Sequence, residues 1–250
     1  MKNKIFQKQS VTLKIFWIIL LLVLPLNIIS ILTSLELFER YAQQIQLSMK
    51  NITDVYMNTI DFHTEKADLY LYELLNNDLE CTILKSPYSS DFEYENAKYR
   101  CHNTLSDQME REEIISGYFL VAGGKHTDCI LALKSDLTDS ESLQIYISDS
   151  RNCDNKWHLA SINGQNLLIR LASEKNFYYG AIVNLDSVQA EMKHQSRYDS
   201  QTIFFSENTP NTDKEHILAS SASSRMDVVL SMEISQKECY RGFPYLNQIF

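Results

Sequence analysis

Residues Asn163 to Val188 read NGQNLLIRLASEKNFYYGAIVNLDSV, a stretch in which tight turns separate β-prone runs. Asn163-Gly164 is the dipeptide that best accommodates the positive φ angles of a two-residue type I′ hairpin. It joins Trp157–Ile162 to Gln165–Ala172, and the polar turn SEKN leads on to a third β-prone run, Phe177–Leu185. The stretch therefore predicts three strands in meander order, most of an antiparallel sheet.

The faces of this sheet follow from the two-residue period of a strand. Leu167, Ile169 and Leu171 fall on one face, and the other face carries Leu168, Arg170 and Ala172. Asp186 stands three residues before Gln189, a spacing that resembles an N-cap. We therefore expect a helix to begin at Asp186.

Further β-prone and helical segments lie on both sides of this stretch. Residues 78–91 predict a loop with one short strand, because Pro87 and polar residues interrupt them. The remaining segments are a helix at 93–113 and strands at 114–122, 128–133, 202–205, 216–220 and 227–234. The elements predict an α+β fold, with a second, smaller set of strands near the end of the chain.

The N-terminal segment has the composition of a membrane anchor. Ile15–Leu35 is uncharged and rich in Leu, Ile and Phe, and 21 such residues can cross a bilayer core of about 30 Å as a helix. The lysines before it, with no acidic residue among them, favour a cytoplasmic N-terminus and an extracytoplasmic remainder; they are Lys2, Lys4, Lys8 and Lys14. A cleaved secretory signal is the alternative, but no A-x-A site follows Ile31.

A long helix is expected to continue directly out of this anchor. From Leu35 to about Asn77 there is neither Gly nor Pro. Apolar residues recur in steps of three and four, the pattern of a bundle or coiled-coil contact; they are Phe38, Ala42, Ile45, Met49, Ile52 and Tyr56. The upper part of this stripe is expected to pack on its own domain. The part near the membrane, with Ile45 and Met49, is expected to pair with a second copy, which predicts a homodimer.

Charge and cysteine content limit the possible partners. The chain has 23 basic and 32 acidic residues, and removing the four basic residues of the anchor leaves 19 against 32, or −13. Such a surface is a poor match for nucleic acid. Five cysteines follow the anchor, so at least one thiol is unpaired. Buried free thiols are favoured over any particular bridge; the local bridge options are Cys81 with Cys101 and Cys129 with Cys153.

Asn163–Val188, together with the lysine-led anchor and the long helix, resembles the outer region of YesM-type sensor histidine kinases. The final segment, ISQKECYRGFPYLNQIF, resembles the stretch before the second membrane helix of such a receptor. The resemblance implies a Cache-type, PAS-like fold, a carbohydrate-related signal and a response regulator that would be reached only through a kinase part. That kinase part does not occur in these 250 residues.

The resemblance divides the chain into six parts. They are a cytoplasmic N-terminus at 1–14, a transmembrane helix at 15–35, a signalling and dimerisation helix at 36–78, a membrane-distal Cache module at 79–195, a smaller membrane-proximal module at 196–245, and the approach to a second span at 246–250. A cell-membrane protein with one N-terminal span and a double-Cache-like outer region is therefore expected.

A PAS-like module binds small molecules between its sheet and the segments that cover it. The residue types that suit such a site are Tyr118, Tyr146, Trp157, Arg170, Tyr179 and Asp186. Aromatic faces can stack on a sugar ring, and the Arg170 guanidinium can bind a carboxylate. For each residue, packing in the core, a surface ion pair or a helix cap is the competing interpretation. A docked, sugar-loaded solute-binding protein is the alternative partner.

Catalytic, metal and cofactor motifs are missing from the sequence. There is no H-E-x-x-H, G-x-S-x-G, EF-hand or G-x-G-x-x-G spacing. His63 in Phe62-His63-Thr64-Glu65 is interpreted as a surface or packing histidine. We therefore expect no catalytic residue, metal or cofactor in this chain. A chemoreceptor, a cyclic-dinucleotide enzyme or a freestanding anchored binding protein remains open as the alternative to a kinase receptor.

Overall fold

The computed structural model describes residues 2–86, 88–122, 128–137, 139–149, 153–174, 177–195, 201–211 and 216–235, without the side chains of 2–12, 15 and 195. The chain forms two compact units, Met1–Ser48 and Met49–Phe250. The predicted approach to a second span at 246–250, Cys239 and Gly123-Gly124 lie outside the described residues.

Helix α1 (Lys2–Asn77) includes the whole apolar run and passes through Pro25. Within Phe16–Asn77 it contains a window of mean hydropathy 2.5, and all residues of this window are exposed. Among the described residues, α1 is the one helix that is long and apolar enough to cross a membrane. Polar side chains in the run bond to their own helix: Asn27 Nδ2 donates to the Val23 carbonyl at 3.0 Å, and Thr33 Oγ1 donates to the Ile29 carbonyl at 2.7 Å. The helix therefore satisfies these polar groups itself, as an apolar surrounding requires.

The buried stripe of α1 differs from the predicted one. Met49 is 2% exposed in a single copy, so it is not free to pair with a second one. Beyond Met49 the stripe does not continue through Ile52 and Tyr56, which are half-buried. It takes two steps of four residues, from Met49 to Thr53 and on to Met57, and then continues through Ile60, Thr64, Ala67 and Leu71. Because the prediction has a step of three residues after Met49 where the structure has a step of four, the buried side beyond Met49 is shifted by one residue from the predicted side.

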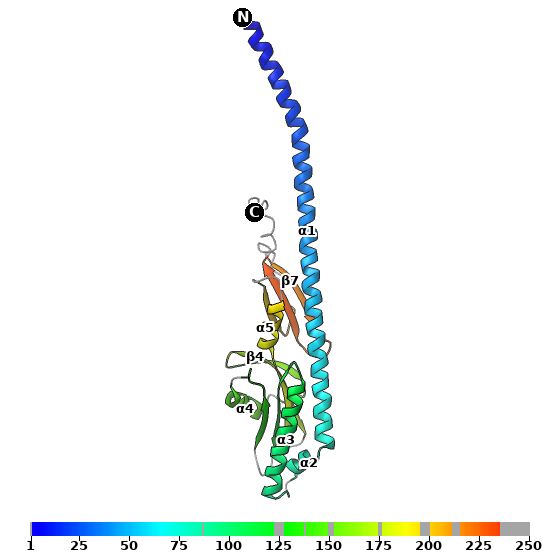
Figure 1. Cartoon of the computed structure of the whole chain (residues 1–250), viewed down its shortest axis with the longest axis vertical. Helices are drawn as coiled ribbons and strands as arrows, with labels where there is room; N and C mark the ends of the chain where they lie inside the picture. Colours follow the sequence, from blue (N-terminus) through cyan, green and yellow to red (C-terminus); the bar gives the residue numbers. More distant parts are fainter. Residues whose placement is uncertain are drawn as a thin grey trace. The chain divides into compact units, whose positions relative to one another are not determined.

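Within the described residues, the second unit continues from α1 with four helices and two antiparallel sheets (Figure 1). In chain order these are α2 (Leu79–Lys85), α3 (Asp91–Arg111), β1 (Ile115–Ala122), β2 (Cys129–Leu133), α4 (Ser140–Ser148), β3 (Trp157–Ile162), β4 (Gln165–Glu174), β5 (Phe177–Asn184), α5 (Leu185–Gln195), β6 (Thr202–Ser206), β7 (His216–Ala222) and β8 (Val229–Ser235). The first sheet has the order β2-β1-β5-β4-β3, and the second has the order β6-β8-β7. The predicted meander β3-β4-β5 is confirmed.

The predicted hairpin turn is also confirmed. Asn163 and Gly164 have φ angles of 48° and 81°, and Ile162 pairs with Gln165 across the turn. Both positive angles belong to a type I′ turn. The local sequence is therefore sufficient to set the register of β3 against β4.

One local prediction is wrong, and two confirmed helices begin at other residues than expected. Residues 79–85 form α2 rather than a loop with a strand, because Asp78 accepts the backbone N–H groups of Glu80 and Cys81 and so caps a helix. Helix α3 begins two residues before Glu93, because Ser90 and Glu93 form a capping box. Helix α5 begins at Leu185, and Asn184 Oδ1 accepts the N–H of Asp186, so Asp186 is not the cap.

Both faces of the first sheet are buried. Helix α4 was not expected from the sequence and covers one face. Its Leu143 and Ile147 pack against Phe119, Ile169 and Ile182 of the sheet. Figure 1 shows α4 on the side of the sheet away from α1. The two helical positions are four residues apart and so lie on one side of their helix. The opposite face of the sheet is covered from the side of α1 and α3.

Candidate functional site

One row of residues crosses all five strands of the first sheet. Cross-strand pairing aligns Ala132, Tyr118, Ala181, Arg170 and Trp157 in this order. Because directly opposed residues point to the same face, the row lies on the face covered by α1 and α3. Tyr118 contacts α1 directly, its ring centroid lying 5.4 Å from that of Tyr70.

The polar end of this row binds a single carboxylate of α1. Arg170 Nε lies 2.9 Å from Asp68 Oδ1, and Trp157 Nε1 donates to the same oxygen at 3.1 Å. Burial raises the pKa of Asp68 above its ordinary value, while Arg170, the Trp157 hydrogen bond and Arg225 oppose that rise. The carboxylate thus lies between two cations in a largely dehydrated position. Removing one of its partners there should destabilise the fold, because a poorly solvated charge would be left unpaired.

The second sheet reaches the same helix through the loop between β7 and β8. Arg225 Nη1 lies 2.8 Å from Glu65 Oε2, and its Nη2 lies 3.6 Å from Asp68 Oδ2. One turn earlier on α1, Asp61 accepts from Ser223 Oγ at 2.5 Å and from Ser224 N at 2.8 Å. We call Asp68, Trp157, Arg170 and Arg225 the Asp68 site, since this one side chain contacts both sheets.

Three acidic residues of α1 carry these contacts, and the sequence analysis missed them. Asp61, Glu65 and Asp68 are four and three residues apart and therefore lie on one side of the helix. That spacing was the available signal. The partners lie from 89 to 163 residues away along the chain, so no local pattern joins them to α1.

The structure brings together four of the six predicted ligand residues. Tyr118, Trp157, Arg170 and Tyr179 share the face toward α1, since Tyr179 pairs with Leu120 and Ala172 in the next row. Tyr118 is fully buried and, among the described residues, its hydroxyl finds no hydrogen-bond partner. Tyr118, Trp157 and Arg170 contact the long helix, so they belong to a contact between elements.

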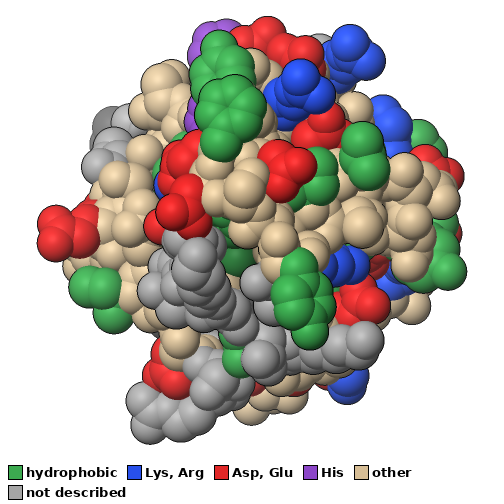
Figure 2. Space-filling view, turned by 90° about the horizontal axis from the view of Figure 1, so that it is seen from below, with side chains coloured by type: hydrophobic (Ala, Val, Ile, Leu, Met, Phe, Trp, Pro, Cys, Tyr) green, Lys and Arg blue, Asp and Glu red, His purple; other side chains and the backbone are tan. Residues whose placement is uncertain are grey.

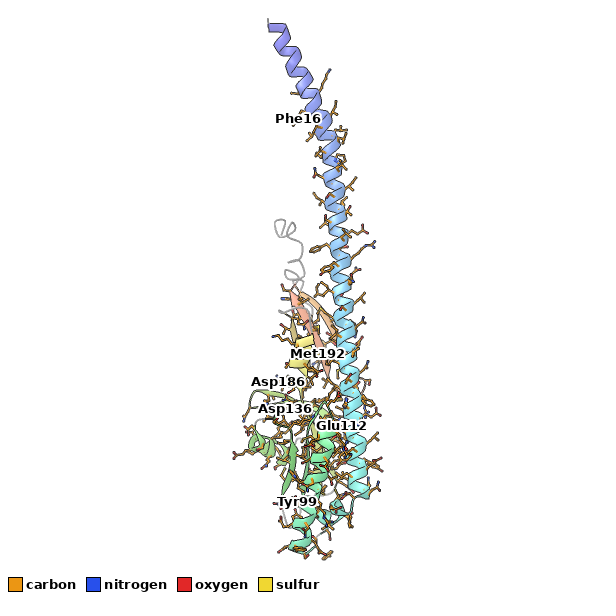
Figure 3. All side chains as sticks on the ribbon, in the orientation of Figure 1. Phe16, Tyr99, Glu112, Asp136, Asp186 and Met192 are labelled. Carbon is orange, nitrogen blue, oxygen red and sulfur yellow. The ribbon has the colours of Figure 1, made fainter. Side chains whose placement is uncertain are left out.

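Tyr146 and Asp186 lie elsewhere. Tyr146 of α4 hydrogen-bonds through its hydroxyl to His158 Nε2 at 2.7 Å. Asp186, labelled in Figure 3, accepts from Asn166 N at 3.0 Å and from Asn166 Nδ2 at 2.9 Å. Its role is to bind the start of α5 to the end of the β3–β4 hairpin. The six residues therefore do not form one site.

An open groove of about 400 Å³ lies along the edge strand β2. It is lined by Glu95, Lys98, Tyr99 and His102 of α3, Cys129, Ile130 and Leu131 of β2, and Gln144 of α4. Tyr99, labelled in Figure 3, is 68% exposed. Lys98 is held by Asp128 at 2.9 Å, and this hydrogen bond raises the Lys98 pKa. The groove has the aromatic and polar mixture of a small-molecule site.

A buried carboxylate, Glu112, joins the end of α3 to α1. Its Oε1 lies 2.7 Å from Lys66 Nζ, and its Oε2 lies 3.1 Å from His63 Nδ1. Burial by itself raises the Glu112 pKa, but the hydrogen bonds from Lys66 and His63 outweigh it and the pKa is lowered. His63 therefore has a packing role, with its ring nitrogen on a structural carboxylate. Glu112 is labelled in Figure 3.

The face shown in Figure 2 mixes chemical types. Apolar side chains lie there among acidic and basic ones. Large exposed apolar residues of the described chain outside the apolar run include Tyr88 and Phe92, ahead of and in the first turn of α3. Isolated residues of this kind are common on protein surfaces.

No family model matches the chain. No curated protein matches it either. Among solved structures, it is similar to the extracellular domain of soHK1S-Z6, a protein assigned as a histidine kinase, at 7% identity and a TM-score of 0.54, over 82% of this chain and 99% of that one. The similarity to mmHK1S-Z3, an extracellular domain assigned in the same way, has 12% identity and a TM-score of 0.46 over 82% and 98% of the two chains.

A chemoreceptor domain is also similar. The ligand-binding domain of Campylobacter jejuni Tlp3, solved with 4-methylisoleucine, has 10% identity and a TM-score of 0.43 over 82% of this chain and 94% of that one. Of these three similarities only the one to soHK1S-Z6 has a TM-score above 0.5, and at 7% identity it concerns the fold alone. The chain has the Cache-like α+β fold of that extracellular sensor domain, and the fold class expected from the sequence is confirmed.

Proposed function

We propose that the chain is the extracytoplasmic sensing region of a membrane-bound sensor histidine kinase of the YesM type. The observation that carries the proposal is Asp68. A single carboxylate on α1 contacts Arg170 and Trp157 of the first sheet and Arg225 of the loop that joins β7 to β8 in the second sheet. A sensor needs such a connection, because a signal received by the sheets must reach the helix that leaves the domain.

The relay follows from this geometry. A ligand that favours one arrangement of the first sheet over another changes the position of Arg170 and Trp157 relative to α1. Asp68 then shifts with them or loses a partner. Either change alters α1, which is one continuous helix from Lys2 to Asn77. The proposed span at 15–35 lies in that helix.

Membrane location and orientation are part of the proposal. The exposed apolar window of α1 supports a single N-terminal span, and the lysines before it support a cytoplasmic N-terminus. Protease added to intact cells should then degrade the part after Leu35. Protection of that part, or recovery of a trimmed protein from the culture fluid, would overturn the orientation.

For the ligand we propose a sugar bound in the groove along β2. The supporting observation is Tyr99, whose 68% exposed ring is available for stacking. Binding of mono- and oligosaccharides to the full chain in detergent should raise its melting temperature, since a ligand that binds only the folded state stabilises it. A docked solute-binding protein remains the alternative partner.

A pair of matched variants tests the groove. Tyr99→Ala removes the stacking surface, whereas Tyr72→Ala removes a tyrosine of α1 that is equally exposed, at 69%, and does not line the groove. We expect the sugar-dependent shift to disappear in the first variant and to persist in the second. Equal shifts in both variants would exclude this groove as the sugar site.

We also propose a homodimer through α1, on a different side from the one predicted. Val55, Phe62 and Leu69 are spaced by seven residues and exposed by 62%, 62% and 59%, which forms an apolar stripe typical of helix pairing. Phe62→Cys should crosslink two copies in membranes, and Asp107→Cys on the exposed side of α3 should not. Equal crosslinking at both positions would refute this contact.

The output domain is proposed from the resemblance alone. A histidine kinase would pass the signal to a response regulator through a kinase part, which these 250 residues do not contain. A chemoreceptor or a cyclic-dinucleotide enzyme could use the same sensing region. Sequencing of the coding region beyond Phe250 separates these outputs: a second span and a kinase core support the first, and a different domain supports the others.

A further inference from the structure

Two cysteines meet in the interior of the corner formed by α2 and α3. Cys81 Sγ lies 3.9 Å from Cys101 Sγ. Their side chains are 0% and 1% exposed, and both are present as free thiols. We propose that Cys81 and Cys101 are a reversible redox site that forms a disulfide when the protein meets a disulfide oxidant.

The geometry is close to that of a bridge. A disulfide needs sulfur atoms about 2.05 Å apart, so the two thiols must approach by roughly 2 Å. Cys81 lies in α2, a helix of seven residues, and Cys101 lies in the middle of α3. A short helix can adjust by that amount more easily than a strand of the central sheet, since few backbone hydrogen bonds fix it.

The reaction is a thiol–disulfide exchange. The oxidant is a low-molecular-weight disulfide, RSSR, or an oxidoreductase with an active-site disulfide. One cysteine thiolate attacks RSSR and releases RS⁻, and the second thiolate attacks the resulting mixed disulfide and releases the second RS⁻. In balance, two Cys–SH and one RSSR give one Cys–S–S–Cys and two RSH, so RSSR accepts the two electrons.

Burial makes this site a slow one. The hydrogen bond with Cys81 and burial raise the pKa of the Cys101 thiol, so little reactive thiolate exists in the closed state. Exchange therefore requires α2 to open. Two ion pairs hold α2, Lys85 Nζ to Glu174 Oε2 at 2.8 Å and Arg100 Nη1 to Glu80 Oε1 at 3.3 Å, and in each the partner outside α2 is at least half exposed. Such pairs contribute little to stability, so the resistance to opening comes mainly from the burial of Cys81 and Leu84.

Metal binding is the competing use of the same thiols. Asp78, Cys81 and Cys101 place three possible ligand atoms within 4.8 Å of one another. A structural zinc site has four ligands, and Asp78 Oδ1 already accepts the N–H groups of Glu80 at 2.8 Å and Cys81 at 3.2 Å. The observations therefore favour oxidation of the pair, and metal binding is an outcome of the test.

The position of the pair gives the bridge a structural consequence. Helix α2 follows α1 directly, with Asp78 between Asn77 and Leu79. A bond from Cys81 to Cys101 fixes the end of α1 to α3. By closing a loop of about 20 residues, it should raise the melting temperature by roughly 5–10 °C. Reduction would release this restraint on the helix proposed to carry the signal.

The test uses the full chain in detergent. The reduced protein is incubated with oxidised glutathione, denatured, alkylated with N-ethylmaleimide and weighed intact. Five thiols less two predicts three adducts, with a single linked peptide joining Cys81 to Cys101 and a reversible rise in melting temperature. Cys81→Ala and Cys101→Ala should abolish the linked peptide and the rise, whereas Cys129→Ala should retain both.

Three results would overturn the site: five adducts after oxidation, glutathione attached to Cys81 or Cys101 without a bridge, or thiols protected from alkylation until a chelator is added. Peptide mapping of the wild-type chain gives this result even if the cysteine variants do not fold. The inference also rests on the proposed extracytoplasmic location. A bridge that forms in purified protein but is absent from cells alkylated before lysis would contradict that location and leave the redox site intact.

Discussion

Arg170 Nε lies 2.9 Å from Asp68 Oδ1, so a guanidinium on strand β4 is paired with a carboxylate on helix α1. The two side chains are 20% and 19% exposed. Asp68 also accepts from Trp157 and lies near Arg225. Removal of either charge therefore leaves an incompletely solvated partner, which is the costly case for an ion pair.

Arg170→Gln should lower the free energy of unfolding by about 2 kcal/mol, below the cost for a fully buried pair because both groups keep some solvent contact. Asp68→Asn should have a similar effect. The double variant should lose less than the sum of the two, with a coupling of about 1 kcal/mol. Urea unfolding of the full chain in detergent, followed by circular dichroism, measures all three.

The control is Arg100→Gln. Arg100 pairs with Glu80 at 3.3 Å, but its side chain is 70% exposed, so the expected loss is at most about 0.5 kcal/mol. If the two arginine variants are equally stable, or if the effects at Arg170 and Asp68 are simply additive, the pair does not couple the sheet to the helix.

Gly180 of β5 is a position where a single methyl group should prevent packing. A Cβ atom there would lie 1.8 Å from the Arg170 carbonyl oxygen and 2.3 Å from Phe119 Cζ. Because a backbone atom of the neighbouring strand cannot move aside, Gly180→Ala should cost about 3 kcal/mol or more. Thermal unfolding monitored by circular dichroism checks this prediction.

Gly117→Ala serves as its matched control in the adjacent strand β1. Its Cβ would meet Leu133 Cδ2 at 2.6 Å and the Ala132 carbonyl oxygen at 3.2 Å. A leucine methyl group can rotate away, so the expected cost is only about 1 kcal/mol. A smaller loss at Gly180 than at Gly117 would show that the strands separate more easily than their register implies.

Glu112 should make stability depend on pH. Its folded-state pKa is lowered from 4.5, so the ionised side chain stabilises the fold above pH 4.5, and this stabilisation is lost as the pH falls through the folded-state pKa. Glu112→Gln should cost about 2 kcal/mol at pH 7, because Lys66 loses its buried partner.

The difference in unfolding free energy between wild type and Glu112→Gln is the measurement, taken from pH 7 to pH 3. It should be constant above pH 4.5 and shrink below it. Glu93→Gln is the control, since its carboxylate also has a lowered pKa but is a solvent-exposed cap. A difference that grows toward low pH would contradict the assignment.

The local sequence was sufficient to predict the strands of the meander, but it was insufficient to predict the Asp68 site. Asn163-Gly164 fixes a turn by its own backbone preferences, and the neighbouring strands follow from it. Arg170 was recognised as a candidate, but its partner was not. Whether Arg170 faces a cavity or a helix depends on where β1 inserts beside β5, and no local pattern encodes that placement.

The errors on α1 and α2 have the same origin. The apolar repeat predicts a buried side for α1, but it cannot say whether a second copy or the chain's own domain covers Met49. Asp78 and the buried residues of α2 form a helix that is too short for periodicity to reveal. The local signal for α2 is Asp78 as a capping residue, with Glu80 in the first turn.

Asp61 should hold the β7–β8 loop on α1. Its carboxylate is buried and accepts from Ser223 Oγ at 2.5 Å, Ser224 N at 2.8 Å and Ser224 Oγ at 2.8 Å. Asp61→Ala leaves the Ser224 N–H and two serine hydroxyls without this charged acceptor, so a loss of about 2 kcal/mol is expected. Amide exchange at 223–228 should accelerate more than exchange in β1, because the loop is released before the first sheet opens.

Asp54→Asn is the control, as its ion pair with Lys50 at 2.6 Å is about 40% exposed and should contribute at most about 1 kcal/mol. Uniform acceleration across both sheets in Asp61→Ala would instead mean that the loop and the first sheet open together, and that α1 holds them as one cooperative unit.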